Sequence, residues 1–264
     1  GLFGEIIHCQ GGYEHDLRAV ADSMKRDHER AWHHLHRNAE LYPTHELGPI
    51  AKILNINRGN RMVSLVSFAS KAAGLNDYNR AIFGEDSPLA NAKFKQGDIV
   101  TTMIQCAGGE TILLTLDTSL PRPYYTRSFT VRGSKGMYTE ETNSLVVEKE
   151  LPKNIEEYRN PPHVKGNADD YQEEYDSPIW KEQLTEGVQQ GHGGIDWHVL
   201  NAFVDAIKDG HPSPIDVYDA AAWMSISALS EASLAQGGKL VEIPDFTGGK
   251  CVKFAKEEPW KYSL

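Results

Sequence analysis

Residues 98–119, DIVTTMIQCAGGETILLTLDTS, hold two runs rich in β-branched and apolar residues, separated by Gly108 and Gly109. Such runs predict strands, and the glycine pair favours a two-residue hairpin turn. A second tight turn is predicted at Gly133 to Gly136. Further strands are predicted in RMVSLVSFAS from Arg61, RSFTVRGSKGMYTE from Arg127, SLVVEKE from Ser144 and KLVEI from Lys239. Because strands close in sequence pair through hairpins, we expect a largely antiparallel sheet arranged as a meander.

The part of the chain before this sheet region starts with a strand-like pattern, which we interpret as the start of a domain cut from a longer chain. Glu5 to Gln10 predicts the first strand, ending at the pair Gly11 and Gly12. The polar, histidine-rich residues from His15 to Arg37 predict a long ordered loop or irregular helices. The spacing of apolar residues from Leu47 to Ile56 predicts a helix.

The part of the chain after the sheet region predicts an excursion and then two helices. Residues 151–191 are rich in proline, acidic residues and tyrosine, and predict a surface excursion without regular secondary structure. IDWHVLNAFVDAIKDG predicts a helix that stops at Gly210, and the helix after Pro214, with Asp216 as candidate cap, stops at Gly237. Residues 1–264 therefore predict one α+β domain, a large and mostly antiparallel open sheet with helices on one face.

Composition narrows the classes of partner. The 264 residues carry a formal net charge of −10, which argues against nucleic-acid and membrane-surface binding, because both need positive potential. No apolar run approaches the roughly 20 residues that cross a bilayer. Cys9, Cys106 and Cys251 lack the spacing of a disulfide framework or a zinc site and predict reduced core residues. We expect a cytoplasmic protein, with a removed export signal as the alternative.

Two short motifs combine tyrosine with histidine. In LYPTHELGP, residues 41–49, Pro43 fixes its own φ and holds Tyr42 and His45 around a bend of nearly determined shape. This bend is either an ordinary helix entry or a place where a phenol and an imidazole exchange protons with a substrate. GGYEHDL, residues 11–17, places Tyr13 and His15 at a strand end, where they form either a solvated loop or the edge of a cleft.

Other motifs are weaker or absent. GHGGID places backbone amides at a helix start, where they can hold an anion or a carbonyl oxygen, but it is not a P-loop. No GxGxxG follows a strand, so a dinucleotide fingerprint is absent, and no GxSxG or distinctive carboxylate pair is present. A metal site is disfavoured, because adjacent histidines on a helix cannot both face one centre. The histidines in question are His28, His33, His34 and His36.

Five motifs in order resemble one known family. They are GLFGEIIHCQGGYEHDL, LYPTHELGP, PRPYYTRSFTVRGSKGMY, GHGGIDWHVLNAF and IDVYDAAAWMSISALSE. The chain resembles the C-terminal domain of the glucose-fructose oxidoreductase and inositol dehydrogenase superfamily, in the branch containing NAD-dependent α-N-acetylgalactosaminidases. The resemblance implies a sugar-binding, often dimer-forming α+β domain that follows a Rossmann domain binding NAD or NADP. That Rossmann domain is absent from this chain, so we expect the chain alone to bind no cofactor and to be inactive.

The resemblance also implies roles for individual residues. Family chemistry oxidises a sugar carbon transiently, eliminates the glycosidic oxygen, adds water and returns the hydride. His45 and Tyr42 are implied as the base of the hydride step and its partner, and Tyr13 as an acid or base of the elimination. Arg30 and Tyr125 are implied to bind the sugar, with Tyr124 as the adjacent alternative to Tyr125. His15 and His192 are further candidates for sugar binding.

Two departures from the family pattern leave the sugar open. Glu46 stands where the glycosidases commonly have glycine, and the segment between Tyr13 and Tyr42 is shorter; both changes border the expected pocket.

Three functions follow as alternatives: the substrate domain of an NAD-dependent oxidoreductase-type glycosidase, a non-catalytic sugar-binding or dimerisation module that partners a separate Rossmann domain, and a simple sugar or polyol dehydrogenase. An exposed apolar sheet face, left by one-sided helical cover, predicts a homo-oligomer through the open sheet.

Overall fold

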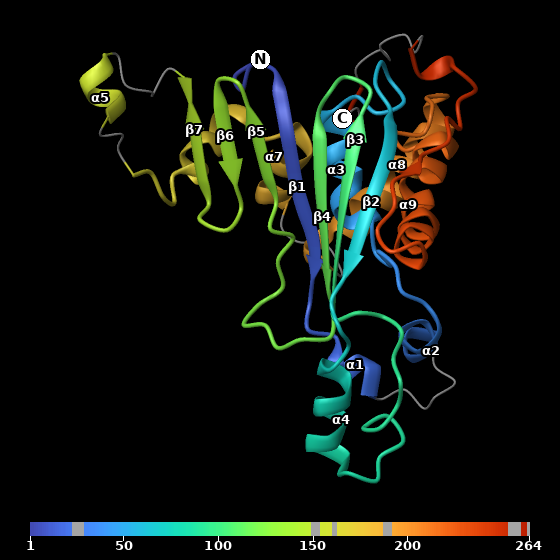
Figure 1. The fold of residues 1–264 in the computed structure, drawn as a ribbon. Helices are drawn as coiled ribbons and strands as arrows, with labels where there is room; N and C mark the ends of the chain where they lie inside the picture. Colours follow the sequence, from blue (N-terminus) through green and yellow to red (C-terminus); the bar gives the residue numbers. More distant parts are fainter. Residues whose placement is uncertain (23–28, 149–153, 160–162, 187–191, 253–259, 263–264) are drawn as a thin grey trace.

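The computed structural model describes residues 1–22, 29–148, 154–159, 163–186, 192–252 and 260–262. Within these residues the strands form an eight-stranded sheet with the order β7-β6-β5-β1-β4-β3-β2-β8 (Figure 1). The strands are β1 Ile6–Glu14, β2 Met62–Ala69, β3 Ile99–Cys106, β4 Thr111–Asp117, β5 Thr130–Gly133, β6 Gly136–Thr139, β7 Ser144–Val147 and β8 Val241–Glu242. The predicted α+β class with a mostly antiparallel sheet is confirmed.

The hairpins were predictable from sequence, but the order of the strands was not. The tight turn at Gly133 to Gly136 is confirmed between the antiparallel strands β5 and β6. The hairpin of β3 with β4 is confirmed too, but its loop has three residues, 107–109, instead of the predicted two, because the amide of Cys106 donates to the carbonyl of Glu110. The predicted meander is wrong, because β1 lies between β5 and β4 and runs parallel to β4, with Cys9 opposite Ile112. The partners of β1 follow it by about a hundred residues, so no local turn signal could place it.

The predicted end of the first strand is also wrong, because β1 continues through its two glycines to Glu14. A Cβ atom at Gly11 would lie 2.7 Å from Cβ of Glu46, and one at Gly12 would lie 2.6 Å from the carbonyl oxygen of Thr115. The glycines therefore allow close approach of a helix and a neighbouring strand rather than a turn.

Several helix boundaries follow the predicted signals. The helices are α1 Arg18–Asp22, α2 Glu29–His36, α3 Thr44–Ile53, α4 Gly74–Phe83, α5 Ile155–Arg159, α6 Gln172–Tyr175, α7 Pro178–Glu186, α8 Ile195–Asp209 and α9 Val217–Ala235. Helix α8 ends at Gly210, which has φ of 72°, and Asp216 caps α9 by accepting hydrogen bonds from the amides of Tyr218 and Asp219. Helix α3 begins three residues before the predicted start, and α4 was not predicted.

One face of the sheet carries the core. Cys9, Ile112, Ile104 and Leu65 form a cross-strand row, and they pack with α3 and α9 into one apolar cluster. The three cysteines are buried and free, as predicted. The opposite face is mixed rather than apolar, since rows such as Gln10–Leu113–Met103–Val66 alternate with threonine-rich rows. The expectation of an exposed apolar face, on which we based the predicted homo-oligomer, is therefore wrong. The homo-oligomer itself stays a prediction.

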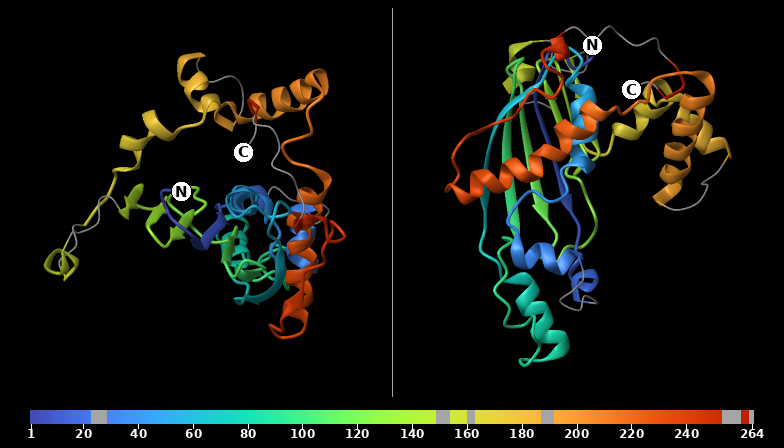
Figure 2. Two further views of the ribbon diagram at one scale, coloured as in Figure 1. Left: turned by 90° about the horizontal axis from the view of Figure 1, so that it is seen from above. Right: turned by 90° about the vertical axis from the view of Figure 1, so that its right-hand side faces the viewer.

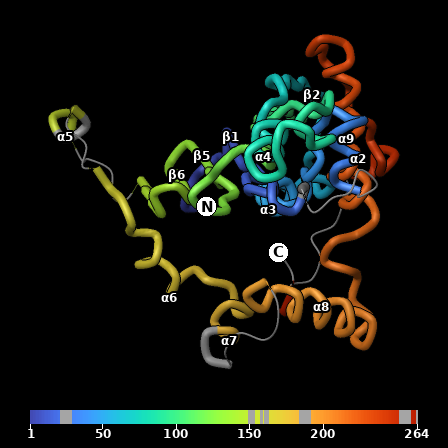
Figure 3. Tube along the Cα trace, turned by 90° about the horizontal axis from the view of Figure 1, so that it is seen from below, coloured from blue at the N-terminus to red at the C-terminus, as the bar shows by residue number. Residues whose placement is uncertain are grey.

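Helices α7 and α8 stand away from the sheet, on the side that α3 covers (Figures 2 and 3). The described parts of residues 151–191 contain short helices, α5 to α7, where we had expected none; residues 151–153, 160–162 and 187–191 lie outside the described residues. Short helices of this kind lack a strong apolar periodicity to reveal them. In the described part of the chain, no helix is long and apolar enough to cross a membrane.

Candidate active site

The two tyrosine-histidine motifs meet in the folded chain. Tyr13 lies near the end of β1, and Tyr42 and His45 lie at the start of α3. The ring centroid of Tyr13 is 4.3 Å from that of His45 and 4.8 Å from that of Tyr42, on which it stacks. Pro43, with φ of −65°, caps α3 and accepts a hydrogen bond from the amide of Leu47, so its fixed φ sets the entry of the chain into the helix.

Three further predicted residues join this cluster. The Tyr13 hydroxyl shares a hydrogen bond of 3.2 Å with Nδ1 of His15. The ring centroid of Tyr125 is 5.7 Å from that of Tyr13, and the Arg30 guanidinium lies 5.7 Å from the ring centroid of Tyr42. Segments far apart in sequence therefore supply one group of ionisable side chains, which we call the tyrosine-histidine cluster: Tyr13, His15, Arg30, Tyr42, His45 and Tyr125.

Two predicted residues are not brought to the cluster. His192 is exposed before α8 and hydrogen bonds through Nδ1 to Asp196 at 2.9 Å, which raises the pKa of His192. Tyr124 is 61% exposed. Among the described residues, neither has a ring contact or hydrogen bond with the tyrosine-histidine cluster. Neighbouring positions such as Tyr124 and Tyr125 cannot be told apart from sequence, because only the backbone decides which of them faces the cluster.

The three tyrosines of the cluster are protonated at neutral pH. Burial raises the pKa of Tyr13, of Tyr42 and of Tyr125. Partial burial, followed by the charge of Arg127, lowers the pKa of His45. At neutral pH the imidazole of His45 is therefore free to accept a proton, and Tyr13 holds one that it can donate. Arg30 opposes the rise for Tyr13 through its charge and a hydrogen bond.

The sequence did not reveal a cavity that His45 helps to line. It has a volume of about 240 Å³ and is lined by His45, Pro49, Arg127, Phe129, Tyr138 and Glu140. Tyr138 lies on β6, Arg127 and Phe129 precede β5, and Glu140 follows β6. The alternation of residue types in RSFTVRGSKGMYTE was the available sequence signal for which side chains share a face of the sheet. Tyr138 pairs with Val131, and Val131 pairs with Cys9, so all three side chains lie on the face that carries the core. Strand order was needed to use this signal.

Two carboxyl groups lie beneath the cluster. Glu46 was expected to border the pocket, but it is only 2% exposed, with its stem against Gly11 of β1. Burial, followed by the charge of Glu40, raises the pKa of Glu46 to about 10. Glu40 is 1% exposed, accepts a hydrogen bond from the amide of Tyr42, and has its pKa raised to about 8 by burial. Both carboxyls are neutral acids at pH 7.

A substitution tests the contact between Gly11 and Glu46. Gly11→Ala is expected to lower the free energy of unfolding by about 1–3 kcal/mol, because its methyl group overlaps the stem of Glu46. Combining Gly11→Ala with Glu46→Gly removes the overlapping atoms and is expected to recover most of that loss, measured by urea denaturation. Gly12→Ala is the matched control, since its methyl group meets a backbone oxygen of Thr115 and gains nothing from Glu46→Gly.

The buried acids also predict how stability depends on pH. A carboxyl whose folded pKa is raised stabilises the fold fully below its unfolded pKa, near 4.3, and loses that contribution as pH rises through the folded pKa. Stability is therefore expected to fall between about pH 5 and pH 8 for Glu40 and up to about pH 10 for Glu46. Glu40→Gln and Glu46→Gln should each flatten this fall in urea titrations at successive pH values; an unchanged slope would contradict the burial of these acids.

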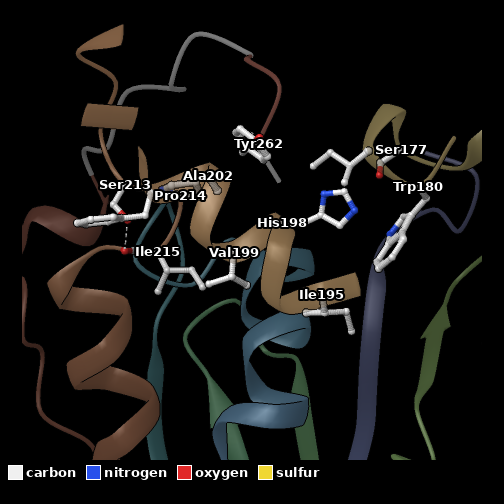
Figure 4. A pocket seen from close by; sticks show the side chains of 12 residues that line it. Ser177, Trp180, Ile195, His198, Val199, Ala202, Ser213, Pro214, Ile215 and Tyr262 are labelled. Atoms are coloured by element: carbon white, nitrogen blue, oxygen red, sulfur yellow. Dashed lines mark hydrogen bonds between the residues drawn. The ribbon is translucent and has the colours of Figure 1, made fainter. Parts of the chain in front are cut away.

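A larger cavity elsewhere holds none of the predicted site residues. It has a volume of about 380 Å³ between α7, α8 and residues 213–215, and apolar side chains such as Ile195 and Val199 line it (Figure 4). Its one imidazole, His198, hydrogen bonds to Gln183. The described residues contain no group of three or more His, Cys, Asp or Glu arranged to hold a metal ion, and His28 lies outside them.

Solved structures share this fold at low sequence identity. Levoglucosan dehydrogenase in complex with NADH aligns with 93% of this chain and 60% of its own, with a TM-score of 0.59 and 17% identity. An oxidoreductase domain protein from Kribbella flavida aligns with 92% of this chain and 60% of its own, with a TM-score of 0.57 and 16% identity. This chain therefore shares the fold of about 60% of each of these two solved chains.

The sequence comparisons identify the family. Residues 1–253 match the model described as glycosyl hydrolase 109, C-terminal domain. A glycosyl hydrolase family 109 protein of Stenotrophomonas maltophilia is 44% identical over 94% of this chain, and an alpha-N-acetylgalactosaminidase of Tannerella forsythia is 40% identical over 96%. The chain belongs to glycosyl hydrolase family 109, which confirms the resemblance. It spans 57% and 56% of the lengths of these two relatives.

Proposed function

We propose that this chain is the substrate-binding part of an NAD- or NADP-dependent glycosidase that acts by transient oxidation, elimination, hydration and re-reduction of a sugar. One observation carries the proposal: His45, whose pKa is lowered, lies with its ring centroid 4.3 Å from that of the protonated Tyr13, in a chain of this family. Relatives carrying the name alpha-N-acetylgalactosaminidase make an α-N-acetylgalactosaminide the first substrate to try.

Residues of the cluster carry out two of the proton transfers, and the C–H proton that the elimination also removes from the carbon next to the transient ketone passes to water. His45 accepts the proton of the sugar hydroxyl whose carbon is oxidised, and the Tyr42 ring, which Tyr13 stacks on, holds the pair in place. Tyr13 donates its proton to the leaving glycosidic oxygen, and the nearby Arg30 favours the resulting phenolate. His15 and Tyr125, whose rings are 5.0 Å apart, bind sugar hydroxyls at the rim.

The cofactor would contact only part of this chain. When bound, a nicotinamide cofactor supplies a hydride acceptor and returns the hydride. His45 is open to solvent beside the cluster and fits the reacting end of such a group. No glycine-rich fingerprint in the sequence fits its pyrophosphate. That absence also supports a second candidate function, a sugar-binding module that needs a separate cofactor-binding domain.

Calorimetry of chain 1–264 with methyl α-N-acetylgalactosaminide tests the site. We expect binding that is weakened about tenfold or more by Tyr13→Phe and by His45→Ala, because each removes a polar contact to the sugar. Tyr124→Phe is the matched control and leaves affinity unchanged, since Tyr124 lies outside the cluster. Absence of heat with this sugar and with a panel of other glycosides would contradict a sugar site. NAD⁺ binding by the chain alone would show that it contains a cofactor site without the glycine-rich fingerprint.

A further inference from the structure

The cavity beside His45 and the tyrosine-histidine cluster lie on the same face of the sheet. Gly11, Tyr13 and Cys9 alternate on the face of β1 that α3 covers, and Cys9 pairs with Val131 of β5. Val131 pairs with Tyr138 of β6, and the amide of Glu140 donates to the carbonyl of Phe129 in the next row. The face therefore runs without interruption from β1 to β6, with His45 of α3 above it.

The cavity combines an aromatic surface with two charged groups. The rings of Phe129 and Tyr138 lie with centroids 6.3 Å apart, and Glu140 accepts a hydrogen bond from the amide of Phe129. The guanidinium of Arg127 has no ion pair or hydrogen bond with the other described residues. Aromatic faces pack against the C–H faces of a ligand, and charged groups make the stronger hydrogen bonds to its hydroxyls. This combination suits a sugar ring.

The reacting sugar ring cannot occupy this cavity alone. The proposed chemistry requires one ring to reach both His45 and Tyr13, but Tyr13 does not line the cavity. The reacting ring therefore lies over the His45–Tyr13 pair, and the cavity receives a group attached to that ring. At about 240 Å³ the cavity is smaller than the ~300–1,000 Å³ of sites for drug-sized ligands and has room for one additional ring.

We propose that this cavity is a subsite for the leaving group of a glycoside, namely a second sugar, and that Arg127 is its specificity-determining residue. The proposal rests on the proposed function and narrows it, because a dehydrogenase acting on a free monosaccharide has no use for such a subsite. Arg127 binds hydroxyls of the second sugar, and Phe129 and Tyr138 pack against that sugar's C–H face.

Calorimetry with two probes tests the subsite on chain 1–264. The probes are methyl α-N-acetylgalactosaminide and the disaccharide in which N-acetylgalactosamine is α-linked to galactose. We expect the disaccharide to bind more tightly. Arg127→Ala should weaken the disaccharide about tenfold while changing the methyl glycoside less than about twofold, as for the loss of one charge-assisted hydrogen bond. Arg132→Ala is the matched control, because Arg132 is exposed on β5 next to Val131 and points to the opposite face.

Each other outcome has a distinct meaning. Equal affinities of the two probes for the parent chain, or no effect of Arg127→Ala on either, would overturn the subsite and leave the proposed function standing. Equal weakening of both probes by Arg127→Ala would assign Arg127 to the reacting ring and also overturn it. Binding of neither probe or any other glycoside by the parent chain would contradict the proposed function itself. Unfolding temperatures of the variants verify that affinity changes do not arise from loss of fold.

Discussion

Replacing His45 by alanine in a full-length protein carrying this chain is expected to lower the turnover of an α-N-acetylgalactosaminide by about 10²–10⁴-fold, the usual contribution of a positioned acid or base. The lowered pKa of His45 leaves its imidazole able to accept a proton near neutrality. Release of nitrophenol from the nitrophenyl glycoside measures the effect. Tyr124→Phe serves as the control, and wild-type rates for His45→Ala would remove His45 from the mechanism.

The pH dependence gives the same prediction a second readout. The folded pKa of His45 lies below its usual value near 6.5. We therefore expect turnover to stay constant as the pH falls to about 6.5 and to decline only at lower pH. The decline should be absent from whatever residual activity His45→Ala retains. An acid limb that persists in the variant would assign the titration to another group.

The largest expected effect on stability is at Asp219, which joins α9 to the end of α3. Its carboxylate is 1% exposed and accepts hydrogen bonds from Arg58 at 2.8 and 2.9 Å and from Lys52 at 3.2 Å. Burial alone would raise the pKa of Asp219, but these cations outweigh it and lower the pKa. Asp219→Ala leaves the cations without their shared carboxylate and is expected to lower the free energy of unfolding by about 3–5 kcal/mol, measured by urea denaturation.

A neighbouring residue on the same helix provides the comparison. Asp216 caps α9 through the amides of Tyr218 and Asp219, so Asp216→Ala is expected to cost only about 1 kcal/mol. A lowered pKa means that the stabilisation by Asp219 is present above its unfolded pKa near 3.9 and is lost as pH falls through the folded value. The difference between parent and Asp219→Ala should therefore shrink in acid. Similar losses for both variants at pH 7 would show that the buried ion pairs contribute little.

The parts of the fold that depend on local signals were predictable from sequence. The glycine turn at Gly108 and Gly109, the stop of α8 at Gly210 and the cap of α9 at Asp216 all act within a few residues. The place of β1 depends instead on pairing with strands a hundred residues later. The glycines of β1 looked like a strand end, because the neighbours that require them, Glu46 and Thr115, are distant in sequence.

The candidate site, like the fold, was predictable from sequence only in part. The motifs around Tyr13 and His45 indicated proton-transfer groups, and the fold brings them together. The cavity beside His45 was not predicted, since Arg127 and Glu140 become neighbours of His45 only through the order β1-β5-β6. Sequence also could not show that Glu46 is buried, because a charged residue in the first turn of a helix usually faces solvent.

Turnover by the full-length protein with a catalytic amount of NAD⁺ and nitrophenyl α-N-acetylgalactosaminide distinguishes transient oxidation from direct hydrolysis and from net dehydrogenation. Transient oxidation requires the cofactor but returns the hydride, so we expect many equivalents of nitrophenol per NAD⁺, no release after the cofactor is removed, and no net accumulation of NADH. Release at full rate without any cofactor, or NADH formed in step with substrate while the glycosidic bond stays intact, would contradict it.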